Sequence, residues 1–115
     1  MQIEKIVLHN LLHDEVYCRQ VLPFLKLDYF ESENKLLYQG ILDFITKYNR
    51  IPSVSSLEID IPNLSDDESQ VTRCLSLLKK FEEKPEVDYQ WILDKTEKWC
   101  KDRSVYLAIM ESINI

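Results

Sequence analysis

The chain contains a single glycine, Gly40, among its 115 residues, together with four prolines. An all-β fold depends on frequent turns, and turns depend on glycine and proline, so this composition predicts long helices with short connections. The hydrophobic share of 45% is enough for a folded core and too high for a disordered chain. We therefore expect one all-α domain of about six helices.

The first helix is expected at residues 2–12, with Ile3, Ile6, Val7 and Leu11 facing the core. Asp14 can cap a second helix, which Pro23 would interrupt. The connector that follows is too apolar for a flexible linker. Three of its side chains are expected to fill the core between helices: Phe24, Leu25 and Phe30.

A third helix is predicted to begin at Ser32 and to stop at the segment 49–52, which contains Pro52. Gly40 lies inside it, where glycine costs about 1 kcal/mol relative to alanine. A neighbouring helix that passes closely over Gly40 would explain this choice. The apolar side chains of this helix recur at helical spacing: Leu37, Ile41, Phe44, Ile45 and Tyr48.

Two shorter helices are expected before Pro85. Ser53 can cap the first, which Pro62 ends, and Ser65 can cap the second with Glu68 in a capping box. Their expected core residues are Leu57, Ile61, Val71, Cys74, Leu75 and Leu78.

The last helix is predicted to run from Asp88 to the end of the chain. At 1.5 Å per residue it would be about 40 Å long, whereas a compact domain of this size has a radius of gyration of about 13 Å. We therefore expect a helical head at residues 1–87 and a projecting helix at residues 88–115. Its seam has the spacing 4, 3, 4, 3, 4, 3: Ile92, Thr96, Trp99, Arg103, Tyr106, Met110 and Ile113.

Six nonpolar residues in a row, Val105 to Met110, interrupt the amphipathic pattern of this last helix. Six consecutive positions go all the way round a helix, and a helix that is apolar all round must be covered on several sides. The printed sequence ends soon afterwards, at Ile115. We expect either that another subunit covers this surface or that the sequence is part of a larger protein.

Trp91 and Trp99 are eight residues apart on the same predicted helix. Core packing is one interpretation of both, and an anchor at a protein interface is the other, because tryptophan is enriched in binding hot spots.

The residues suggest no catalytic centre. One glycine cannot build a phosphate-binding loop or a dinucleotide-binding fingerprint, so we expect no nucleotide hydrolysis by that route and no cofactor in this segment. His9 and His13 have the i, i+4 spacing of a metal pair, but no third ligand is evident and a surface or capping role is favoured. Cys18, Cys74 and Cys100 have no close cysteine partner and are expected to fill the core of a reduced protein.

The net charge of −6 makes strong binding to phosphate backbones unfavourable. Residues 51–72 carry five acids and no lysine or arginine, and we interpret this run as a solvated surface. No apolar run is long enough to cross a bilayer. The odd number of cysteines, with no two close in sequence and no signal peptide before them, leads us to expect a reduced, cytoplasmic protein.

The order of several segments resembles that in the N-terminal domain of DnaB-like phage replicative DNA helicases, in particular the T4-like phage helicase. Two segments are the most specific, Val21 to Glu31 and Trp91 to Arg103. The remaining matching pieces, spread over nearly the whole chain, are Ile6-Val7-Leu8, Val16 to Leu25, Asp28 to Glu31, Tyr48-Asn49, Ile51-Pro52-Ser53 and Leu57.

The resemblance implies a helical head followed by a helical hairpin, of which the chain reaches the first helix. In this family hairpins pair and build a collar on a hexameric ring, and the collar contacts primase or other replisome proteins. A separate motor domain binds ATP and Mg²⁺ and unwinds DNA. The resemblance makes four side chains candidates for assembly: Tyr106, Ile109, Met110 and Ile113.

Three other functions stay open at this point. A free-standing phage factor of the same fold would bind the helicase or the primase, to load or inhibit it. A helical DNA-binding module is disfavoured by the negative charge. A small enzyme has no recognisable constellation. The first interpretation, a helicase domain, predicts a reading frame that continues beyond Ile115 into the motor.

Overall fold

The computed structural model describes residues 3–113, which form six α-helices and three short 3-10 helices, with no strand among the described residues. The all-α prediction is confirmed. The elements in chain order are α1 (Ile3–His13), α2 (Glu15–Val21), η1 (Leu22–Phe24), η2 (Leu27–Tyr29), α3 (Ser32–Tyr48), α4 (Val54–Asp60), η3 (Ile61–Asn63), α5 (Glu68–Lys80) and α6 (Tyr89–Ile113).

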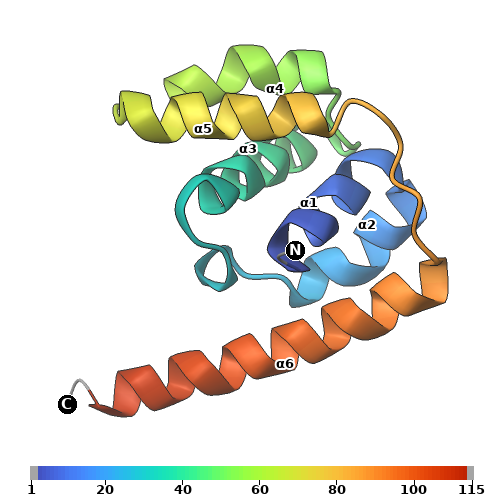
Figure 1. Cartoon of the computed structure of the whole chain (residues 1–115), viewed down its shortest axis with the longest axis vertical. Coiled ribbons are helices and arrows are strands. Elements are labelled where there is room, and N and C mark those ends of the chain that lie inside the picture. Colours follow the sequence, from blue (N-terminus) through green and yellow to red (C-terminus); the bar gives the residue numbers. More distant parts are fainter. Residues whose placement is uncertain (1–2, 114–115) are drawn as a thin grey trace.

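The helices pack around α1 and α3 (Figure 1). Helices α4 and α5 lie side by side and cover one side of α3, while α6 runs along the opposite side of the molecule, against α1 and α2. The principal dimensions are 40 × 36 × 28 Å. None of the described helices combines the length and the apolar character needed to span a membrane.

Local signals explain several helix boundaries. The Asp14 carboxylate accepts a hydrogen bond from the Tyr17 amide at 3.0 Å, which caps α2 as predicted. Ser53 caps α4 by accepting from the Ser56 amide at 3.1 Å. Asn49 adopts the left-handed conformation, φ 54°, that commonly ends a helix, and α3 stops there.

Helix α5 begins differently from the prediction. Its capping residue is Asp67, whose carboxylate accepts from the Gln70 amide at 3.1 Å, and not Ser65. The Ser65 hydroxyl instead accepts from the Asp67 amide and donates to Gln70. Aspartate and serine are comparable capping residues, so the sequence offered two nearly equal starting points, and the helix uses the later one.

Gly40 lies where α3 meets α4 and η3. A Cβ atom built on it would approach Leu57 at 3.3 Å and Ile61 at 3.4 Å. The predicted close neighbour is therefore present, and it explains why the middle of a helix has no side chain here.

The connector between α2 and α3 corrects one prediction. Leu25 and Phe30 are buried as expected, but Phe24 is 68% exposed. Pro23 is the central residue of a 3-10 turn over Leu22–Phe24, and after this turn Leu25 faces the core while Phe24 faces solvent. Tyr48 at the end of α3 is also half exposed, and it packs against Phe44 at a ring distance of 4.6 Å.

Candidate docking surfaces

The first half of α6 is fixed to the head by its seam. Ile92, Thr96 and Trp99 are buried, and the Trp99 ring meets Tyr29 and Phe30 edge-on at centroid distances of 6.0 and 5.0 Å. Thr96 makes a buried polar link as well. Its hydroxyl donates to the Ile92 carbonyl at 2.6 Å and so accepts from the Tyr17 hydroxyl at 2.7 Å. Burial raises the pKa of that tyrosine, which therefore stays a neutral donor.

Arg103 lies at the boundary between the part of α6 that packs against the head and the part that is mostly exposed. Its guanidinium donates to the Asp28 carbonyl at 3.1 Å and lies 3.8 Å from the Glu31 carboxylate. The same guanidinium stacks over the Tyr106 ring, 5.0 Å from its centroid. Arg103 thus links the head to the first residue of the seam that solvent reaches.

The second half of α6 presents an exposed apolar surface, which we call the apolar stripe. Its members are 39% to 68% exposed: Val105, Tyr106, Ile109, Met110 and Ile113. Positions four apart share a helix face, so Val105, Ile109 and Ile113 form one row. Leu107, on the side facing the head, is partly buried against the core. The four side chains expected to serve assembly therefore share one surface, and their role in assembly stays a prediction.

The two tryptophans have different environments. Trp99 is 8% exposed and belongs to the core, so the core-packing interpretation holds for it. Trp91 is 42% exposed, with the Lys95 ammonium 6.0 Å from its ring centroid. Eight helical residues turn the direction of a side chain by about 80°, and this rotation separates the two rings. The interface interpretation remains for Trp91 alone.

A groove of about 570 Å³ runs between α2 and α6, and we call it the α2–α6 groove. The sequence did not predict this groove, because Phe24 was assigned to the core. Pro23, which lies in the same tight turn as Phe24, was the available signal. The residues that line the groove are Gln20, Val21, Phe24, Gln90, Leu93, Asp94, Thr96, Glu97, Cys100 and Lys101.

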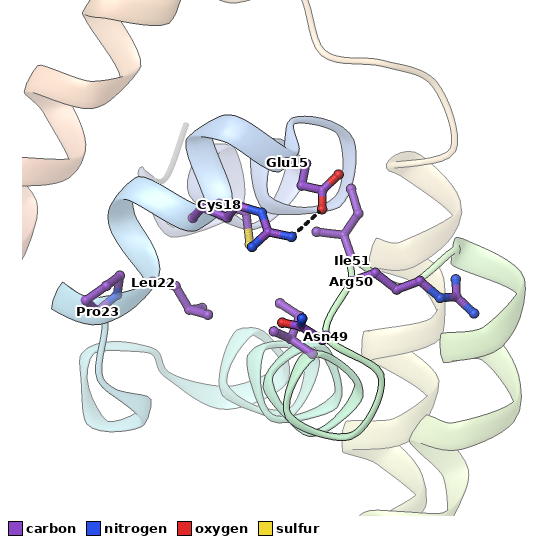
Figure 2. Close-up of a pocket in the computed structure, with 9 residues that line it drawn as sticks. Glu15, Cys18, Leu22, Pro23, Asn49, Arg50 and Ile51 are labelled. Atoms are coloured by element: carbon purple, nitrogen blue, oxygen red, sulfur yellow. Dashed lines mark hydrogen bonds and ion pairs between the residues drawn. The ribbon is translucent and has the colours of Figure 1, made fainter.

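A smaller pocket of about 250 Å³ lies between α2 and the end of α3 (Figure 2). Arg19 in this pocket pairs with Glu15 at 2.8 Å, and both side chains are largely exposed. Figure 2 shows Arg50 extending away from that pair. Its guanidinium lies 5.2 Å from the centroid of the Phe44 ring. Of the two arginines that line the pocket, Arg19 is already paired with a carboxylate and Arg50 lies against an aromatic ring, so the pocket suggests no particular ligand.

His9 and His13 join α1 to the end of α5. The ring nitrogen Nε2 of His9 lies 2.7 Å from the Glu83 carbonyl, and that of His13 contacts the Phe81 carbonyl. The His9 ring also stacks on Phe81 at 4.5 Å. Desolvation lowers the pKa of His9, which favours the neutral imidazole. Within residues 3–113 no three potential metal ligands converge, and the observed contacts agree with the capping role favoured from the sequence.

The three cysteines are free thiols buried in the core, as predicted. Burial raises the pKa of Cys74 to about 12 and those of Cys18 and Cys100 to about 11. At neutral pH these thiols are protonated, and thiols of this kind are poor nucleophiles.

The acidic run at residues 51–72 covers α4, η3 and the beginning of α5. Within the described part of the chain, the ion pairs involve other carboxylates, and Asp67 is used as a helix cap. The run has the character of a solvated surface, as the sequence indicated.

The chain is similar to the DnaB-like replicative helicase of Enterobacteria phage T4, with 30% identity over 112 residues. The alignment takes in 96% of this chain and 23% of that helicase, so the chain spans about a quarter of the length of this relative. No family model matches the chain. The resemblance inferred from the residues is thus confirmed, and the partial coverage is consistent with an N-terminal domain.

Proposed function

We propose that this chain is an assembly and protein-docking domain of a DnaB-like replicative DNA helicase. The apolar stripe carries the proposal, because five large apolar side chains are exposed together on one short helical segment. Clusters of this kind mark interaction sites. The similarity to the phage T4 helicase supports the helicase context.

In this proposal the chain contributes to the collar of a hexameric helicase and contacts primase or another replisome protein. ATP and Mg²⁺ would act in a separate motor, because a chain with one glycine cannot build a phosphate-binding loop of the usual kind. The motor would unwind DNA, and this chain, with its net charge of −6, would bind DNA weakly.

Self-association of the 115-residue chain tests the proposal. Sedimentation velocity over a wide concentration range is expected to show a mass that rises with concentration. Ile109→Asp places a charge in the stripe and is expected to keep the chain monomeric. Ile59→Asp is the matched control, because Ile59 is 72% exposed on α4, away from the stripe, and it should associate like the wild type.

Circular dichroism confirms that each variant is folded before the masses are compared. A wild-type chain that stays monomeric at all concentrations overturns the assembly role. Equal association of the Ile109→Asp and wild-type chains overturns the assignment of the stripe.

A further inference from the structure

We draw no further inference here: the strongest candidate, the α2–α6 groove with the exposed Phe24 at its edge, is an apolar surface for which nothing in the structure shows what covers it.

Discussion

One hydrophobic seam runs through both halves of α6, residues 89–103 and residues 104–113. The head buries the apolar seam residues of the first half and leaves those of the second half exposed. In the first half Ile92, Thr96 and Trp99 lie against α2 and the α2–α3 connector. In the second half the apolar residues also spread round the helix, so no single neighbour within the chain could bury them all. A regular seam therefore predicts a partner for the helix, and that partner can belong to the same chain or to another one.

The largest difference between the two halves is expected in stability. Trp99→Ala removes a buried ring that contacts Tyr29 and Phe30 and should lower the free energy of unfolding by about 3–5 kcal/mol. Ile109→Ala should change it by less than about 0.5 kcal/mol in dilute solution, because solvent already reaches that side chain. Urea unfolding at low protein concentration measures both, and similar values for the two variants would remove the distinction between the halves.

The two halves of α6 are also expected to differ in how the labelling rate of a cysteine depends on pH. Burial raises the pKa of Cys100 to about 11, so its thiolate is scarce at pH 8 and labelling should rise about tenfold per pH unit above that. A cysteine introduced by Ile109→Cys should have an ordinary pKa of about 8.5 and be labelled on the order of 100-fold faster at pH 8. Its rate should then level off above pH 9.

Native Cys18 and Cys74 serve as internal controls, because burial raises their pKa values too. In denaturant all the thiols should react at similar rates. Fast labelling of Cys100 in the folded chain would show that the first half of α6 separates readily from the head.

A buried polar link joins α2 to the first half of α6, whereas the described contacts of the second half include no such link to the head. Thr96→Val leaves the Tyr17 hydroxyl buried without an acceptor and should cost about 1–3 kcal/mol. Tyr17→Phe removes the hydroxyl itself while Thr96 still donates to Ile92, so it should cost about 0.5–1.5 kcal/mol. Thermal or urea unfolding compares the two, and the reverse order would mean that water reaches this bond.

The helices and most of the core residues could be predicted from the sequence. Periodicity located α3 and α6 because its signal is local: the buried seam at Ile92 and Trp99 follows from spacing alone. The shift of the α5 cap from Ser65 to Asp67 and the outward turn of Phe24 were not predicted. For the cap, two capping residues of similar strength lie two positions apart, so local preference does not choose between them. For Phe24, the tight turn over Leu22–Phe24 was not recognised from Pro23.

Of the two candidate surfaces, one could be predicted from the sequence and the other could not. The run from Val105 to Met110 was identified as an uncovered surface because six nonpolar residues in a row cannot all be buried by one neighbour. The family resemblance then made Tyr106, Ile109, Met110 and Ile113 the candidates for assembly. The α2–α6 groove was not identified, because it exists only once η1 and α6, about 70 residues apart in sequence, lie together. A surface on one element can be recognised from a pattern, whereas a surface shared by two elements requires the fold.

Leu107→Ala is expected to lower the free energy of unfolding by a small amount, and that amount locates the boundary between the two halves of α6. Leu107 lies on the inner side of α6 and is partly buried against the core, two residues before the exposed Ile109. Leu107→Ala should therefore cost about 1 kcal/mol in urea unfolding, below the 2–5 kcal/mol typical of a fully buried leucine and above the value for Ile109→Ala. Ile113→Ala is the control at the far end and should have no measurable effect on the monomer. A cost for Leu107→Ala as large as that of a core leucine would move the boundary a full turn toward the end of α6, and Tyr106 would then be better regarded as part of the head.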